Sequence, residues 1–187
     1  MPSHIHKFAV ALTLLASTQA LLADEERTNE PVVFSSWDGT CYAKSVPRSD
    51  FGDDGTTTIY KVGVASDAAS DAFNWYSRSV YVLCDVWDGA HSWTAVVRVF
   101  KMSSGFQADN ETPAIEFYVS GKLVKRYSTL EIAGKPENVF VSVSHYTPFR
   151  TVLGFRANGS GQFEFVTILA DGRELRFDWK TGRTRAL

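Results

Sequence analysis

The sequence has few of the residues that most often build catalytic centres and metal sites. It contains two cysteines and four histidines. Two of those histidines, His4 and His6, precede the residues that we assign to the mature chain. Neither a Gly-x-Ser-x-Gly elbow nor a His-Glu-x-x-His motif occurs. No enzyme class therefore follows from a motif, and we expect His91 to have a structural or surface role.

An excess of charge of either sign is also missing. The chain has 19 Lys and Arg residues against 21 Asp and Glu residues, for a net charge of −2. Proteins that bind nucleic acid show a basic excess clustered on one face. We therefore expect no nucleic-acid partner.

Long apolar runs are absent, and a short one lies at the N-terminus. Residues 8–16 are apolar except for Thr13, follow Lys7, and precede the small-x-small sequence Thr18-Gln19-Ala20. This run is shorter than the roughly 20 residues that a spanning helix needs, and its layout is that of a secretory signal peptide. We predict that residues 1–23 are the signal. Residues 24–187 would then form a periplasmic or extracellular protein with no membrane span and a loose N-terminal arm.

Cys41 and Cys84 are the two cysteines, and each lies near a Trp-Asp-Gly triplet that begins at Trp37 or Trp87. In an oxidising compartment an isolated pair of cysteines most often forms a disulfide. Closing this loop would stabilise the fold by about 4 kcal/mol in the chain-entropy model. Asp-Gly is turn chemistry, so we expect two turned strand ends beside the disulfide, with the Trp side chains packed near it.

Short runs rich in Val, Ile, Thr and aromatic residues dominate the mature chain, which is typical of strands. Hairpin turns are predicted at Ser120-Gly121, between Asn158 and Gly161, and at Asp171-Gly172. Residues 80–86 fit a strand with little polar face, and residues 92–101 are apolar on both faces, which indicates a central strand. The prediction is a single all-β domain, an antiparallel β-sandwich or barrel-like sheet of about ten short strands, with at most one or two short helices.

Three segments are less clear. Residues 66–76 have helical spacing but also fit a loop that leads into a strand. Ser128 and Glu131 fit a capping box for a helix of less than two turns. Residues 139–146 alternate as one strand, with Val139, Val141 and Val143 on one face.

Two aromatic and polar clusters are candidate binding sites. Exposed aromatic side chains beside an arginine are common on binding surfaces. Loops that combine aromatic and polar residues also often carry function. The members of the two clusters are Phe73, Trp75, Tyr76 and Arg78 in the first, and His145 and Tyr146 in the second.

The acidic loop with Asp50, Asp53 and Asp54 is a candidate calcium site. Ca²⁺ takes six to eight oxygen ligands, and three carboxylates between glycines are a partial set. The alternative interpretation is a solvated turn. No other cofactor is expected.

Two function hypotheses follow. The first is an exported, non-enzymatic binding module for a protein or a glycan, and the sequence favours it over an enzyme. The second is an extracytoplasmic hydrolase that uses a carboxylate pair. Glu116 and Glu164 are preferred for that pair because their apolar neighbours could raise a pKa on burial. The wider set of acids from which a pair could come is Asp85, Asp88, Glu116, Glu164 and Asp178.

Overall fold

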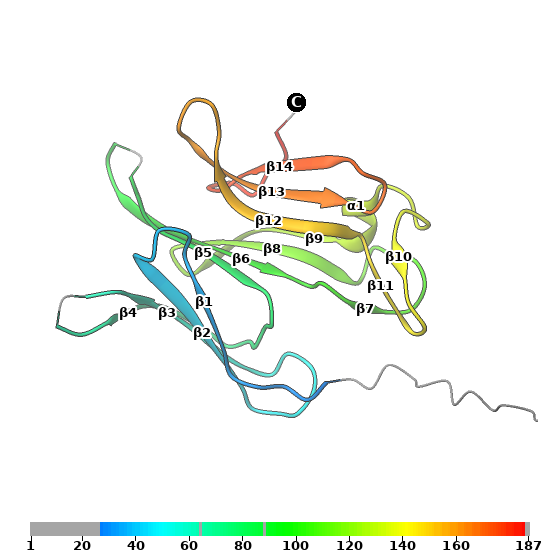
Figure 1. The fold of residues 1–187 in the computed structure, drawn as a ribbon, viewed down its shortest axis with the longest axis horizontal. Coiled ribbons are helices and arrows are strands. Elements are labelled where there is room, and N and C mark those ends of the chain that lie inside the picture. The colour runs from blue at the N-terminus through cyan, green and yellow to red at the C-terminus, as the bar shows by residue number, and fades with distance from the viewer. Residues whose placement is uncertain (1–26, 64, 88, 186–187) are drawn as a thin grey trace, which may run out of the picture.

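The chain folds into strands that form four antiparallel sheets (Figure 1). The structure is a computed structural model, and it describes residues 27–63, 65–87 and 89–185. Within these residues there are fourteen strands and one short helix. The expected all-β class is confirmed, and a sandwich-like arrangement fits it. The predicted signal peptide, residues 1–23, lies outside the described residues.

Three of the sheets form layers, with the central sheet between the other two (Figure 1). The N-terminal sheet has the strand order β1 (Val32–Ser35), β2 (Cys41–Pro47), β3 (Gly55–Lys61) and β4 (Ala68–Phe73). The central sheet has the order β5 (Val80–Trp87), β6 (Ser92–Val99), β8 (Pro113–Val119) and β9 (Lys122–Ser128). The C-terminal sheet has the order β12 (Phe149–Ala157), β13 (Phe163–Leu169) and β14 (Glu174–Asp178).

A smaller fourth sheet lies beside these layers, in the order β10 (Phe140–Val141), β11 (His145–Thr147) and β7 (Ser103–Ser104). The helix α1 (Thr129–Ala133) follows β9 directly. Its N-cap Ser128 accepts a hydrogen bond from the backbone of Glu131, and the Glu131 side chain accepts one from the backbone of Ser128. The predicted capping box is therefore confirmed, and Gly134 ends the helix with a left-handed backbone.

The inner strands of the central sheet, β6 and β8, are buried on both faces, as the apolar run at residues 92–101 predicted for β6. Side chains alternate between the faces of a strand. On β6, Val97 and Val99 pack toward the C-terminal sheet, whereas Val96 packs toward the N-terminal sheet. Arg98 lies on the same face as Val96, so a charged side chain sits in a layer that is otherwise mostly apolar.

The core between the central and C-terminal sheets is aromatic. Phe117, Phe155, Phe165 and Phe177 are almost fully buried there. Their ring centroids are 5.0–5.8 Å apart in the closest pairs, which is a favourable range for aromatic contacts. The predicted hairpin from β13 to β14 brings Phe177 into this core, and Trp179 follows on the same side.

The core between the N-terminal and central sheets contains the disulfide. Cys41 on β2 and Cys84 on β5 are bonded, with Cα atoms 6.2 Å apart, as predicted. Both Trp-Asp-Gly triplets begin next to hairpin turns. The expected packing of their Trp side chains near the disulfide is wrong, because Trp37 and Trp87 are 66% and 67% exposed. Trp37 instead contacts Phe163 of β13, with ring centroids 5.9 Å apart.

Two segments are now assigned. Within residues 66–76 the structure has β4 rather than a helix, because β3 offers an edge on which residues 68–73 pair. Residues 139–146 do not form one strand. The chain turns at residues 142–144, so β10 pairs back on β11, and the backbone amide of Ser142 donates to the carbonyl of His145 at 2.8 Å.

Candidate functional site

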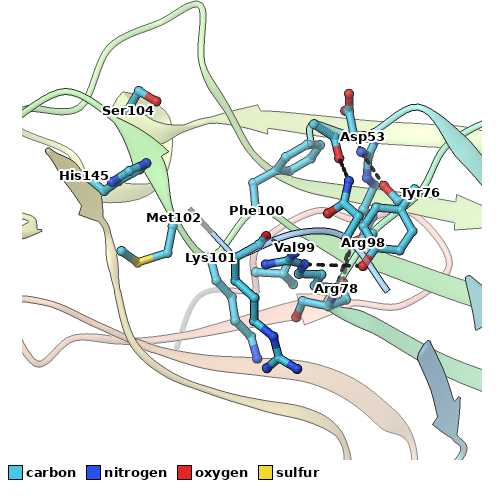
Figure 2. A pocket seen from close by; sticks show the side chains of 15 residues that line it. Asp53, Tyr76, Arg78, Arg98, Val99, Phe100, Lys101, Met102, Ser104 and His145 are labelled. Atoms are coloured by element: carbon cyan, nitrogen blue, oxygen red, sulfur yellow. Dashed lines mark hydrogen bonds and ion pairs between the residues drawn. The ribbon is translucent and has the colours of Figure 1, made fainter. Parts of the chain in front are cut away.

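A pocket of about 500 Å³ opens at one end of the central sheet (Figure 2). One wall comes from the arm at residues 27–29, the β2–β3 loop and the β4–β5 connection. The other comes from the end of β6, the residues that follow it, β7 and β11. Segments that are far apart in the sequence thus meet around one cavity.

Four cationic side chains line this cavity, which we call the cationic pocket. They are Arg27, Arg78, Arg98 and Lys101, and Asp53 is the one carboxylate among the lining residues that the structure describes. Like charges gathered around a concave surface focus a positive potential there. The cationic pocket is therefore suited to an anionic group.

Arg98 is the buried member of the set. Its side chain is 7% exposed, and its guanidinium group lies 4.8 Å from the ring centroid of Trp75 and 4.3 Å from that of Phe100. One terminal nitrogen donates to Asp53 at 2.6 Å and to the carbonyl of Tyr76 at 3.0 Å. The Nε atom has no hydrogen-bond partner among the described residues. A buried N–H group without a partner is costly.

A row of charges across three strands holds Arg98 in place. Arg98, Glu116 and Arg126 are register partners on β6, β8 and β9. Arg98 Nη1 lies 3.6 Å from a Glu116 carboxylate oxygen, and Arg126 Nε donates to the other oxygen at 2.7 Å. The Tyr118 hydroxyl also donates to Glu116, at 2.7 Å. Burial, followed by this hydrogen bond, raises the pKa of Tyr118, so the hydroxyl keeps its proton and remains a donor.

The other three cations of the pocket are exposed. Arg27 pairs with Glu30 at 3.0 Å. Arg78 donates to the Tyr76 hydroxyl at 3.3 Å and also to the carbonyl of Arg27. Lys101 is exposed and has no ion pair or hydrogen bond within the described residues. These groups can turn toward a ligand without first breaking a buried ion pair.

The N-terminal arm is held against the pocket wall where the structure describes it. Asn29 donates from its backbone to the carbonyl of Asp50 at 2.6 Å and from its side chain to the carbonyl of Gly52 at 2.8 Å. The Tyr76 hydroxyl donates to the carbonyl of Glu30 at 2.9 Å. These bonds connect residues 29 and 30 of the arm to the β2–β3 loop and to Tyr76, and the looseness of the arm stays a prediction.

The predicted binding residues separate into two groups. Tyr76, Arg78 and His145 line the cationic pocket. In the view of Figure 2, Met102 lies between His145 and Tyr76. Phe73 and Trp75 stack on each other in the core beneath it, with centroids 4.9 Å apart.

Tyr146 belongs with the second group, because it is also buried. Its hydroxyl lies 3.0 Å from that of Thr129 and donates to Asp109 at 3.2 Å. Consecutive side chains of a strand point to opposite faces, so Tyr146 points into the fold and its neighbour His145 points the other way. Tyr146 and Thr129 thus tie β11 to the start of α1.

The acidic loop does not bring its carboxylates to a common point. Asp53 pairs with Arg98 at 2.6 Å, and Asp54 lies 3.5 Å from Arg48. Across the described ranges no group of three or more His, Cys, Asp or Glu residues is arranged to hold a metal ion. Calcium binding by Asp50, Asp53 and Asp54 stays a prediction.

The preferred carboxylates of the hydrolase hypothesis lie in different sheets, and each has arginine partners. Glu116 belongs to the row of charges on the central sheet. Glu164 on β13 accepts from Asn158, Arg176 and Arg185 at 3.0–3.1 Å. The Asn158 hydrogen bond, opposed by burial and aided by the two arginines, lowers the pKa of Glu164. Neither carboxylate lines the cationic pocket.

The remaining acids of the wider set are also held by partners where they are described. Hydrogen bonds from Lys61 and Ser92 lower the pKa of Asp85. Burial acts to raise the pKa of Asp178, but hydrogen bonds, first from Arg185, lower it overall. Asp88 lies outside the described residues.

Sequence reasoning missed Arg27, Arg98, Lys101 and Met102 as pocket residues. Arg98 alternates with valines in a strand that reads as fully buried, and this was the signal that could have identified it. A charged side chain at such a position needs partners. Arg27 gave no signal, because it joins the pocket through the arm's hydrogen bonds to a distant loop.

Comparisons with known proteins assign no family. A search of protein-family models, curated proteins and solved structures finds no match to this chain. Within residues 27–63, 65–87 and 89–185, no helix is both long enough and apolar enough to cross a membrane. The function of this chain is therefore inferred from the geometry of the cationic pocket.

Proposed function

We propose that the protein is an exported, non-enzymatic binding domain whose cationic pocket recognises an anionic group. The observation that carries this proposal is the set of four cations around one cavity with a single carboxylate. Proteins and glycans, the two partner classes expected from the sequence, both display carboxylate, phosphate or sulfate groups. Export to the periplasm or the cell exterior is supported by the signal-like N-terminus and by the disulfide.

The division of roles within the pocket supports recognition of an anion. Arg98 is fixed by Asp53, Glu116 and two aromatic rings, so binding costs little of its side-chain entropy. Arg78 and Lys101 are exposed at the entrance. A fixed donor below and adjustable cations above can bind several acidic groups, and charge-assisted hydrogen bonds are among the stronger ones.

The side chains in the pocket favour binding over catalysis. A hydrolase that acts by a carboxylate pair needs one carboxyl group with a raised pKa as the general acid. The pocket holds one carboxylate, Asp53, which is paired with Arg98. The Nδ1 atom of His145 lies 2.8 Å from the Ser144 hydroxyl. Among its described hydrogen bonds, the His145 ring has no carboxylate partner to orient it as the base of a triad. The hydrolase hypothesis remains an untested alternative.

Binding of a small sulfated oligosaccharide, measured by fluorescence polarisation, tests the proposal. The double variant Arg78→Gln/Lys101→Gln removes two cations from the entrance. Each lost charge-assisted hydrogen bond is worth about 1.5–3 kcal/mol, so we expect the Kd to rise by at least about tenfold.

The matched control is Lys44→Gln/Lys122→Gln. Both lysines are exposed and lie outside the pocket. The control therefore changes the net charge by the same amount as the pocket variant. An equal loss of affinity in the two double variants would mean that the oligosaccharide responds to overall charge, and the proposal would fail.

A further inference from the structure

Large apolar side chains are exposed together around the small fourth sheet. We call this group the apolar tip. Its members are 45–64% exposed and consist of Met102, Phe106, Phe140, Val141 and Val143. They lie on β10, on the β10–β11 turn and on both sides of β7. Exposed apolar patches on a soluble protein often mark an interaction site.

The apolar tip is continuous with the cationic pocket. Met102 belongs to both, and it follows Lys101 directly. Ser104 and His145 of the pocket are register partners in the small sheet. Arg150 adds a further cation at the other side, where its guanidinium group lies 5.9 Å from the Phe140 ring centroid. A partner of this face therefore meets apolar side chains and positive charge together.

The shape of the apolar tip argues against one flat partner. Phe140 and Val141 are consecutive residues of β10, so their side chains point to opposite faces of the strand. Both are about half exposed, and Val143 in the turn is 62% exposed. A rigid surface that docks on one face covers one of these side chains and leaves the other in water. A fluid apolar medium surrounds the hairpin and covers both.

The backbone of this hairpin is suited to such a medium. The Ser142 amide donates to the carbonyl of His145 at 2.8 Å, and the Ser142 hydroxyl donates to the same carbonyl at 3.2 Å. Register pairs Phe140 with Thr147 and Val141 with Tyr146. Backbone groups that enter the outer part of a bilayer must be satisfied within the protein, and at the turn the Ser142 amide and the Ser144 carbonyl, which accepts from the Gly105 amide at 3.0 Å, have such partners.

We propose that this face docks on an anionic membrane surface, with the apolar tip inserted among the lipid headgroups and an acidic headgroup bound in the cationic pocket. The inference rests on the proposed function, because the pocket must accept an anion. It goes further by naming the ligand class as an anionic lipid. Basic residues near a membrane are attracted to its negative surface potential, and the apolar side chains provide the second contribution to binding that stable anchoring requires.

Co-sedimentation with large vesicles tests the proposal. Vesicles of phosphatidylcholine alone are compared with vesicles that also contain about 30% phosphatidylglycerol, a negative surface of the kind that attracts basic residues. The purified protein should bind the anionic vesicles and bind the neutral vesicles at least about tenfold more weakly. Equal binding to both, or no binding to either, would overturn the proposal.

The tip variant Val141→Asp/Val143→Asp should lose at least about tenfold in binding to anionic vesicles, because two charges must then enter the interface. Its control, Val33→Asp/Leu123→Asp, places the same charges at exposed apolar positions on two other sheets. The control should bind like the unchanged protein. If the two variants behave alike, the tip is not the insertion site.

Two further readouts separate this inference from the proposed function. The tip variant should still bind the sulfated oligosaccharide, since its changes lie outside the pocket lining. If the unchanged protein binds the oligosaccharide but no vesicle, the membrane inference fails and the proposed function stands. If it binds neither, both fail. If the protein instead self-associates through the tip, as judged by light scattering, and ignores vesicles, the membrane inference fails.

Discussion

The two faces of the central sheet are held by different kinds of contact. Toward the C-terminal sheet the core is a group of phenylalanines in mutual contact. Toward the N-terminal sheet, smaller side chains and a group of three aromatic rings lie beside the disulfide and the buried pair of Arg98 and Glu116. The cationic pocket opens on this second side.

This difference indicates that the two sides of the central sheet are stabilised in different ways. Burying an aromatic ring stabilises the fold mainly by removing apolar surface from water, and this needs no polar partner. A buried ion pair, in contrast, gains little net stability, because desolvation offsets the attraction between its charges. The core on the N-terminal side therefore contains charged groups, and the core on the C-terminal side excludes them. The disulfide supplies part of the stability that these charged groups do not provide. The following predictions test this contrast, from the largest expected effect to the smallest.

Phe165→Ala should be the most destabilising change on the aromatic side. Phe165 is fully buried and contacts Tyr81, Phe117 and Phe155. Removing such a ring leaves a cavity, so the free energy of unfolding should fall by about 3–5 kcal/mol in urea titrations. Phe140→Ala removes an exposed ring and should change the free energy of unfolding by less than about 0.5 kcal/mol. Similar losses for the two variants would contradict the assigned core.

Replacing Cys41 and Cys84 together with alanine should lower the free energy of unfolding by about 4 kcal/mol. The loss should be uneven in space, because the bond joins β2 of the N-terminal sheet to β5. Hydrogen exchange should show faster exchange of amides in β2 and β3 while those of β13 keep their protection. Equal loss of protection in both sheets would mean that the two sides unfold as one unit.

Glu116→Gln should lower the free energy of unfolding by about 3 kcal/mol, because it leaves two arginines without their shared carboxylate. The variant should also weaken binding of the sulfated oligosaccharide, since Arg98 loses a partner that positions it. Glu137→Gln, at an exposed acid, is the control and should change neither property. Loss of stability with unchanged binding would show that Arg98 does not contact the ligand.

The smallest predicted effect is a pH dependence that comes from Glu164. Its folded-state pKa is below the ordinary value of 4.5. The stabilisation is therefore complete above that value and is lost as the pH falls through the lowered pKa. The difference in unfolding free energy between the protein and Glu164→Gln should be under about 1 kcal/mol at neutral pH, since its arginine partners are partly exposed. The difference should shrink in acid, and one that grows in acid would contradict this direction.

Much of the fold could be predicted because its signals are local. The turn at Ser120-Gly121 has positive φ at both residues, as its sequence suggests, and the capping box at Ser128 depends on residues three apart. The disulfide followed from counting two cysteines in a chain that was predicted to be exported. The layer order did not follow, because it depends on which strand faces pair across the core.

The site was harder to predict than the fold, since its residues come from five separate segments. Tyr76 and Arg78 of the predicted aromatic cluster line the pocket, whereas Phe73 of the same cluster is buried in the core and Trp75 packs against that core. Whether a side chain on a strand faces water depends on whether another sheet covers that face of the strand. Local composition does not contain that information.

The bond between Cys41 and Cys84 also decides how the protein responds to mechanical tension. A pull on the two ends of the chain passes from β1 to Cys41 and then crosses the sulfur–sulfur link into β5. The intervening loop, which holds β3 and β4, stays slack. In a tethered molecule under stretch, the segment that carries Asp53 and Tyr76 would therefore bear no tension, while force acts on the strands outside that covalent ring.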